Sequence, residues 1–254
     1  MSTVTPAPLA ARTLLAAAWP LFQVSWPSCL PLALIGVAAS GSPQAAAIAA
    51  GEPRGLVHSP EWWGLYLASA ALMLICQGAM LLRQHALSER SSLSVFDALR
   101  LSGRRLPLHA ITAVAVVLPL AVAIALVPIN GIAAAVLAVA GLLLLVWQCF
   151  AWPVALLEGA SPAAALHEGA ALARGRWREL LMLVATAFSG VLVFVLLAGI
   201  GLGIVMSIAG MSPHPGSMMV GFSRFLLAGV IAIPVVWLGA VWVTAYRLVR
   251  PGQP

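Results

Sequence analysis

Residues 106–157 read LPLHAITAVAVVLPLAVAIALVPINGIAAAVLAVAGLLLLVWQCFAWPVALL, and the stretch contains no Asp, Glu, Lys or Arg. A bilayer core about 30 Å thick requires about 20 apolar residues in a helix, so the stretch is long enough for two crossings. Pro128-Ile129-Asn130-Gly131 divides it. Proline presets one backbone dihedral and Asn-Gly accepts positive φ, so these residues predict a tight turn between two antiparallel helices.

The composition of the whole chain agrees with this membrane interpretation. Of the 254 residues, 62% are hydrophobic and 8% are charged. Soluble domains contain about 25% charged and about 45–50% apolar residues. This chain has too few polar side chains to cover the surface of a water-soluble fold of its size.

Further charge-free runs predict further crossings, so we expect an all-α polytopic membrane protein with six transmembrane helices. The expected spans are residues 20–39, 62–82, 106–127, 132–157, 180–209 and 225–246. Pro27 and Pro31 predict a kink in the first span. Residues 1–254 then form a single transmembrane domain.

The arginines, which supply all 13 basic residues, predict the orientation of the spans. Eleven fall on the side that holds both termini, whereas only Arg54 and Arg224 fall on the other side. Loops rich in basic residues stay in the cytoplasm. We therefore expect both termini to be cytoplasmic.

Two arginine-bearing segments are expected to form short cytoplasmic amphipathic helices in the headgroup plane. Ser94 begins the first, and Asp97 completes an acidic capping box. Ser161 begins the second, with Pro162 at the first helical position. On one continuous helix, Glu168, Arg174 and Arg178 would share the polar side.

These segments also suggest an internal repeat. Residues 94–99 and 161–166 both read Ser-x-x-x-Ala-Leu, and residues 5–10 offer a looser third copy. The unit would be a short interfacial helix followed by a transmembrane hairpin, with copies at 1–88, 89–157 and 158–254. Chance similarity in a chain rich in Ala and Leu explains the same pattern.

The candidate functional residues belong to these two segments. They are Arg100, Arg104, Arg105, Arg174, Arg176, Trp177 and Arg178. One hypothesis is a surface that binds anionic lipid headgroups, each arginine contributing about 1 kcal/mol, or a membrane-protein partner. The other hypothesis is a solvated collar that only orients the fold.

Glu158 is expected to form a structural ion pair. It stands at the end of a predicted span, where a carboxylate needs a partner or water. Arg174 and Arg178 of the following segment are the expected partners.

The sequence contains no recognisable catalytic or metal-binding pattern. His167-Glu168 begins an H-E-x-x-H pattern, but position 171 is Ala, so zinc would lack its second imidazole. The absence of lysine excludes P-loop and Schiff-base chemistry. We expect no enzyme activity, no metal and no cofactor. The arginines are divided among short segments between apolar runs, which does not favour nucleic acid as a partner.

Other uncharged side chains in the predicted spans have structural interpretations. Cys29, Cys76 and Cys149 are expected to be buried as small apolar groups. Gly199, Gly203 and Ser207 recur at helical spacing and predict close helix packing. Gln23, Gln77 and Gln148 either form interhelical hydrogen bonds or line a pathway. A small-solute or lipid transporter or channel, with a pathway between the repeats, is thus the alternative function.

The stretch from Glu158 to Trp177 resembles a known family. Its residues read Glu158-Gly-Ala-Ser161-Pro-Ala-Ala-Ala-Leu166 and then Ala173-Arg-Gly-Arg-Trp177. The pattern is similar to that of the YciC-like bacterial six-helix inner-membrane proteins, and of the related membrane domain fused to some glycerophosphoryl diester phosphodiesterases. This chain has His167-Glu168-Gly169 where those proteins usually have Arg-Arg-Ser.

The resemblance implies a multi-pass protein of the bacterial inner membrane without an established activity of its own, in an envelope or lipid context. We expect a non-enzymatic role, as an envelope- or lipid-related protein or as an accessory protein of a membrane complex. Hydrolysis in the fused phosphodiesterases belongs to a separate domain, so the resemblance supplies no catalytic residue.

Overall fold

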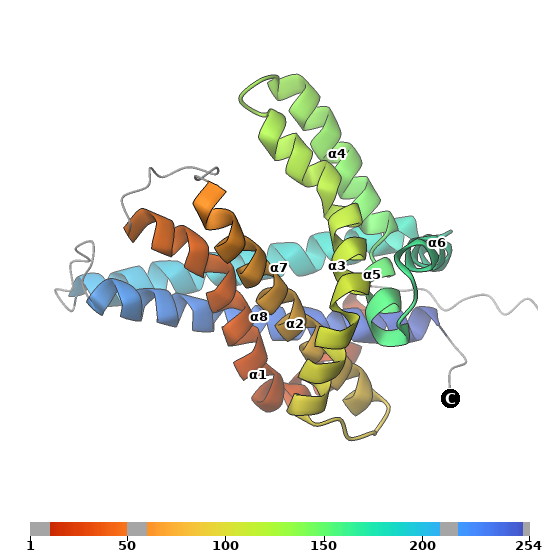
Figure 1. Ribbon diagram of the computed structural model, residues 1–254. Coiled ribbons are helices and arrows are strands. Elements are labelled where there is room, and N and C mark those ends of the chain that lie inside the picture. The colour runs from red at the N-terminus through yellow and green to blue at the C-terminus, as the bar shows by residue number, and fades with distance from the viewer. Residues whose placement is uncertain (1–10, 50–59, 209–217, 251–254) are drawn as a thin grey trace, which may run out of the picture. The chain divides into compact units, whose positions relative to one another are not determined.

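The computed structural model describes residues 11–49, 60–208 and 218–250, which form helices and short turns with no strand among them (Figure 1). The elements are α1 (Ala11–Ala49), η1 (Pro60–Trp62), α2 (Trp63–Ser88), α3 (Val95–Leu126), α4 (Gly131–Trp147), α5 (Ala151–Pro153), η2 (Val154–Glu158), α6 (Pro162–Ala173), α7 (Trp177–Ile208) and α8 (Met218–Val249). The expected all-α class is confirmed for this part of the chain.

Five helices are long and apolar enough to cross a membrane: α1, α2, α3, α7 and α8. The number is six if α4 and the following turns, α5 and η2, form one bent crossing. The chain therefore has the make-up of a multi-pass membrane protein. Every one of the six predicted spans overlaps one of these helices.

The chain folds into two compact units. Unit 1 consists of Met1–Pro20, Arg104–Ala187 and Val241–Pro254, and unit 2 consists of Leu21–Gly103 and Phe188–Ala240. The long helices α1, α3, α7 and α8 each contribute residues to both units. The described residues of unit 1 include eight arginines and three glutamates, so most of the basic charge of the chain lies in this unit.

Unit 2 contains a buried amide that joins three helices. Gln84 of α2 is fully buried, and its Nε2 donates to the Val236 carbonyl oxygen of α8 at 2.9 Å and to the Ser25 hydroxyl of α1 at 3.3 Å. The Gln84 side chain lies directly against Gly239, where a Cβ would collide with it. Interhelical hydrogen bonds of this kind hold apolar helices together without exposing a polar group to lipid.

The sequence predicted a separate short helix that begins at Ser94. In the structure this helix is continuous with the next span. α3 begins at Val95 and continues through Pro107 to Leu126. The start is as predicted, because the Ser94 hydroxyl accepts the Asp97 backbone N–H at 3.0 Å. Proline removes a backbone donor and its ring crowds the preceding turn, yet α3 continues through Pro107, whose side chain is exposed.

The first span differs from its prediction in length. α1 runs unbroken from Ala11 to Ala49, through Pro27 and Pro31. The third predicted interfacial segment, at residues 5–10, lies outside the described residues. A separate short helix, α6, is present before α7, but none is present before α3. The three-unit repeat stays a prediction.

The hairpin of α3 and α4 forms where it was predicted, but the positive φ expected at Asn130-Gly131 is absent: Asn130 is extended, at φ −152°, and Gly131 begins α4. The Asn130 side chain caps α4 by accepting the backbone N–H groups of Ile132 and Ala133 at 3.1 and 3.0 Å. Gly141 of α4 lies against Leu120 of α3, where an added Cβ would approach the Leu120 side chain to 3.0 Å. The two helices run side by side as an arm of unit 1 (Figure 1).

The expected span 132–157 is not one continuous helix. α4 ends at Trp147, and the chain bends by 50° before it continues as α5 and the π-helical turn η2. We call residues 148–158 the break segment. Its contacts come from distant parts of unit 1, which is the physical reason that the local sequence did not reveal it.

Two further expectations have different outcomes. Cys29, Cys76 and Cys149 are buried and free, as predicted. The close packing predicted for Gly199, Gly203 and Ser207 is wrong for the part of the chain that the structure describes. Nothing approaches a Cβ built on either glycine within 4 Å, and Ser207 is exposed. Small residues at helical spacing form a face that a second helix can approach closely. The spacing does not show that a second helix packs there.

Candidate functional site

The site begins with the break segment, which is packed against α6. Gly169 of α6 lies so close to Ala151 that a Cβ on Gly169 would be 2.6 Å from the Ala151 backbone nitrogen. The Ala165 and Ala173 side chains, one turn to either side, are also buried. A stripe of small residues on α6 thus lets the two backbones approach closely.

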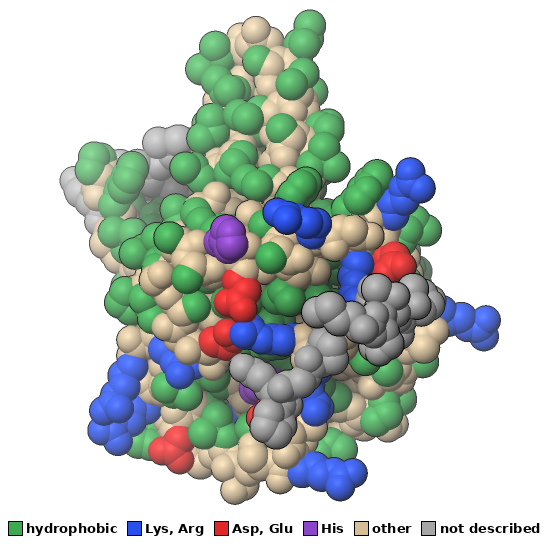
Figure 2. Space-filling view, turned by 90° about the vertical axis from the view of Figure 1, so that its right-hand side faces the viewer, with side chains coloured by type: hydrophobic (Ala, Val, Ile, Leu, Met, Phe, Trp, Pro, Cys, Tyr) green, Lys and Arg blue, Asp and Glu red, His purple; other side chains and the backbone are tan. Residues whose placement is uncertain are grey.

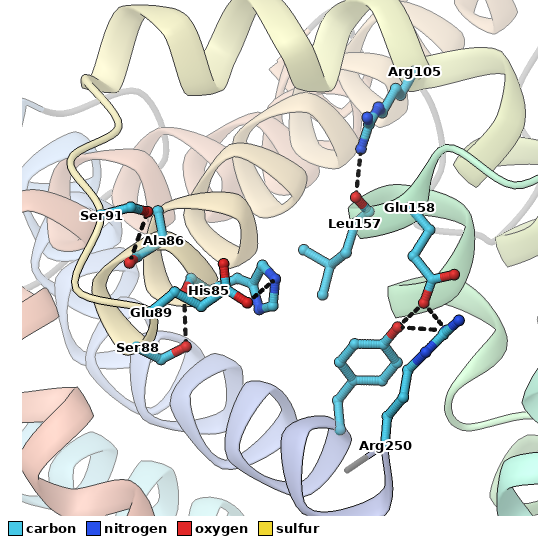
Figure 3. Close-up of polar contacts among 10 residues, drawn as sticks. His85, Ala86, Ser88, Glu89, Ser91, Arg105, Leu157, Glu158 and Arg250 are labelled. Carbon is cyan, nitrogen blue, oxygen red and sulfur yellow. Dashed lines mark hydrogen bonds and ion pairs between the residues drawn. The ribbon is translucent and has the colours of Figure 1, made fainter. Parts of the chain in front are cut away.

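Two side chains from other helices hold the backbone of the break segment. Trp242 of α8 donates its indole N–H to the Cys149 carbonyl oxygen at 2.9 Å. Arg105 of α3 donates to the carbonyl oxygens of Leu156 and of Leu157, the second at 2.8 Å (Figure 3). These carbonyls belong to the last turn of η2, where a cation also interacts favourably with the helix dipole.

The carboxylate of Glu158 completes this arrangement. Its Oε1 accepts hydrogen bonds from the Tyr246 hydroxyl and from Arg250 Nη1 (Figure 3). Arg250 Nη1 also donates to the Tyr246 hydroxyl at 3.0 Å, and its Nη2 lies 2.9 Å from Glu168 Oε1 of α6. One arginine at the end of α8 therefore binds two glutamates, one on each side of the Gly159–Ser161 turn.

The expected partner of Glu158 was wrong. Arg250, and not Arg174 or Arg178, forms the ion pair. The reason is that α6 ends at Ala173, so Arg174 and Arg178 do not continue its polar side. Gly175, at φ 78°, turns the chain into α7.

A buried histidine lies beside the break segment. His109 of α3 is fully buried, and its Nδ1 accepts the indole N–H of Trp152 at 3.3 Å. The pair adds a further polar link between α3 and α5.

The turn between α6 and α7 presents the remaining basic side chains. We call residues 174–178 the α6–α7 corner. Arg174, Trp177 and Arg178 are exposed, and the Arg178 guanidinium lies 5.5 Å from the centre of the Trp177 ring. Arg176 is half-buried, and its Nη1 is enclosed without a hydrogen-bond partner. Within the described residues, no carboxylate forms an ion pair with any of these three arginines.

Figure 2 shows the side of the molecule on which α6 lies. Red and blue side chains lie close together near its centre. The arm at the top, formed by α3 and α4, shows only hydrophobic and tan atoms. The arm shows no charged side chain in this view, as expected of the charge-free stretch 106–157.

The structure separates the seven predicted site residues into three groups. Arg174, Arg176, Trp177 and Arg178 lie together at the α6–α7 corner. Arg105 is engaged with backbone carbonyls, so its role in the structure is to cap η2. Arg104 is exposed on α3 in unit 1, and Arg100 is exposed in unit 2.

Sequence reasoning missed the side chains that come from α8. Trp242 was given no partner from the sequence, and Arg250 was only one of the eleven arginines on the side of the termini, yet both bind the break segment. Nothing local in the sequence pairs them with residues almost a hundred positions earlier. The polar Glu158, at the end of an apolar run, was the one signal that a partner was needed.

The chemistry of the site is that of charge pairing and hydrogen bonding. In the described ranges, no group of three His, Cys, Asp or Glu side chains is placed to hold a metal ion. The chain matches no protein-family model, no curated protein and no solved structure with which it was compared.

Proposed function

We propose that the chain is a non-enzymatic inner-membrane protein whose α6–α7 corner binds anionic lipid headgroups. One observation carries the proposal. Arg174 and Arg178 are exposed on either side of an exposed Trp177, and within the described chain neither has a carboxylate partner. A tryptophan beside unpaired arginines is suited to the headgroup region, where the indole prefers to lie.

The electrostatics of the corner favour an anion. Three arginines within five residues repel one another, and α7 begins there with the positive end of its dipole. Glu179, in the first turn of α7, offsets part of this charge. Glu158 and Glu168, the other two glutamates of the unit, are already bound by Arg250. A phosphate headgroup would supply the missing negative charge.

We infer that the chain crosses the membrane six times, with α4, α5 and η2 as one bent crossing and both termini in the cytoplasm. The support is the number of candidate spans and the distribution of the arginines. A reporter fused to the C-terminus, active only in the cytoplasm, should be active. A reporter at residue 55 should be inactive, and the reverse pattern would refute this orientation.

The lipid proposal is tested with matched pairs of substitutions. The double variant Arg174→Gln/Arg178→Gln removes two exposed arginines from the corner. The control Arg12→Gln/Arg90→Gln removes two exposed arginines elsewhere and has the same net charge. Delipidated protein is titrated with phosphatidylglycerol and with phosphatidylethanolamine, and bound lipid is counted by native mass spectrometry.

The corner variant should lose its preference for phosphatidylglycerol, whereas the control variant keeps it. If each arginine contributes about 1 kcal/mol, the affinity for phosphatidylglycerol should fall roughly thirtyfold. Equal losses in both variants would mean that only net charge matters, and the proposal would fail.

The broken crossing favours one alternative function, transport of a small solute or lipid. Transporters commonly place a binding site where a transmembrane helix is interrupted. Gln148 lies at the break, and its Oε1 is enclosed without a hydrogen-bond partner. A transporter should lose solute uptake into liposomes in Gln148→Leu. If uptake depends on Gln148, the lipid-binding function is not the main one.

A further inference from the structure

Unit 2 contains a groove between α1 and α8 that the proposed function does not use. Its volume is about 580 Å³, within the range of about 300–1,000 Å³ that is typical of small-molecule sites. α1 contributes the segment from Val37 to Ala45, and α8 contributes the segment from Phe225 to Ile231. The walls are mostly apolar, and none of the described lining residues carries a charge.

The groove lies at the ends of two candidate spans. The first runs from Ala11 to Ala46 and the second from Phe225 to Val249, so Ala45 and Phe225 mark the outer end of the groove. From Phe225 to Ile231 the groove follows α8 for about 9 Å at 1.5 Å per residue. It therefore extends from the predicted membrane surface into the hydrocarbon region.

The lining also changes in polarity along α1. Val37 and Ala38 stand at the inner end, whereas Ser40, Ser42 and Gln44 lie toward the outer end. The Ser40 and Ser42 hydroxyls donate to carbonyl oxygens of their own helix, at 2.7 and 2.9 Å, and their oxygens keep lone pairs that can accept. The α1 wall is therefore apolar at its inner end and gains uncharged polar side chains toward its outer end, which matches a molecule with a hydrocarbon tail and a polar end at the interface.

We propose that this groove holds one acyl chain of a bilayer phospholipid, with the glycerol region of the lipid beside Ser40, Ser42 and Gln44. In a membrane, a groove with apolar walls is filled by the surrounding hydrocarbon, because unfilled space forfeits dispersion contacts. The described lining residues are uncharged, so the contacts that they offer are to the acyl chain and the glycerol region and not to the charge of the headgroup. This binding is independent of the α6–α7 corner.

Gly41 makes the groove testable without disturbing the fold. It lines the groove, and a Cβ built on it meets nothing within 4 Å. Gly41→Leu would therefore fill the groove from α1 without a clash, and leucine favours the helix more than glycine does. Gly203→Leu is the matched control, because Gly203 is equally open, is also helical and lies outside the groove lining.

The experiment uses the full chain in vesicles of phosphatidylethanolamine and phosphatidylglycerol, doped with phosphatidylethanolamine that carries a diazirine on one acyl chain, close to its ester end. After irradiation, labelled peptides are identified by mass spectrometry. Labelling should be higher in the groove than at the exposed Leu196 and Leu197 of α7, which report contact with bulk lipid. Gly41→Leu should lower groove labelling to the α7 level, and Gly203→Leu should not change it.

Equal labelling of groove and α7 in the unsubstituted protein would overturn the proposal, as would groove labelling that persists in Gly41→Leu. A second measurement identifies the occupant directly. A photoreactive amino acid in place of Gly41 should cross-link to phospholipid. Cross-links to another segment of the chain, or to a second copy, would show that protein fills the groove and would also overturn the proposal.

Discussion

The two ends of α4 make contrasting connections. At the first end, Asn130 caps the helix through its own side chain and the turn from α3 involves only neighbouring residues. At the second end, the break segment is held by Arg105, Trp242 and Arg250, which come from other helices. The first connection is encoded locally, whereas the second depends on the assembled unit.

This difference shows how backbone polar groups are hydrogen-bonded where a helix of an apolar chain ends. A tight turn satisfies its backbone groups through its own capping residue. A bend within a span leaves carbonyl groups away from water, and each unsatisfied group is costly. The break segment therefore requires donors from elsewhere, and substitutions of those donors should be more damaging than substitutions at the turn.

The largest effect is expected at Gly169. Gly169→Leu would drive a side chain into the backbone of Ala151, so it should destabilise the fold by about 1–3 kcal/mol or more. Thermal unfolding of the protein in detergent measures the loss. Gly131→Ala, at the turn, meets nothing within 4 Å and should leave the unfolding temperature nearly unchanged. Similar losses in both would remove the contrast between the two ends.

The second effect concerns the ion pairs of Arg250. Arg250→Gln leaves Glu158 and Glu168 without their cation, and we expect a loss of about 2 kcal/mol in the free energy of unfolding. Arg174→Gln is the control, because Arg174 is exposed and has no ion pair with another described residue. Its effect on denaturant-induced unfolding should be close to zero. If the two variants unfold alike, Arg250 does not hold the break segment.

A smaller loss is expected for Trp242→Phe. Phenylalanine keeps the aromatic ring but lacks the N–H that reaches the Cys149 carbonyl oxygen, so the loss should be about 1 kcal/mol. Trp147→Phe provides the comparison, since the Trp147 side chain is half-exposed at the end of α4. Hydrogen exchange should accelerate at residues 149–154 in the first variant alone. Unchanged exchange there would contradict the assigned role.

The smallest effect is expected at the turn. Asn130→Ala removes the cap of α4 and should cost about 1 kcal/mol or less, while Asn130→Asp keeps an acceptor and should be nearly neutral. Amide exchange at Ile132 and Ala133 should rise only in the alanine variant. A loss as large as that of Arg250→Gln would show that the turn supports the whole unit.

Much of the fold could be predicted because its signals are local. Apolar runs placed the long helices, Pro128 to Gly131 placed the hairpin turn, and Ser161 with Pro162 placed the start of α6. Two predictions were wrong. A separate helix was predicted before residue 106, but α3 is continuous, and one unbroken span was predicted over residues 132–157, but the chain bends after α4. Both depend on what surrounds a residue: Pro107 lies on an exposed face, and residues 148–158 have partners far along the chain.

The candidate site could be predicted only in part for the same reason. Arg174, Trp177 and Arg178 are neighbours in sequence, so their grouping was visible before the structure was known. Arg105 carries the same charge, but its binding to the carbonyls of Leu156 and Leu157 follows from the packing of α3 beside η2. Charge alone does not distinguish an arginine that caps a helix from one whose side chain is exposed.

The most direct test of the central claim is mass spectrometry of the protein extracted in a mild detergent without delipidation. If the α6–α7 corner binds anionic headgroups, one class of anionic lipid should be enriched on the protein relative to the membrane. That enrichment should disappear in Arg174→Gln/Arg178→Gln and persist in Arg12→Gln/Arg90→Gln. A protein that carries lipid in the same proportions as the membrane would contradict the claim.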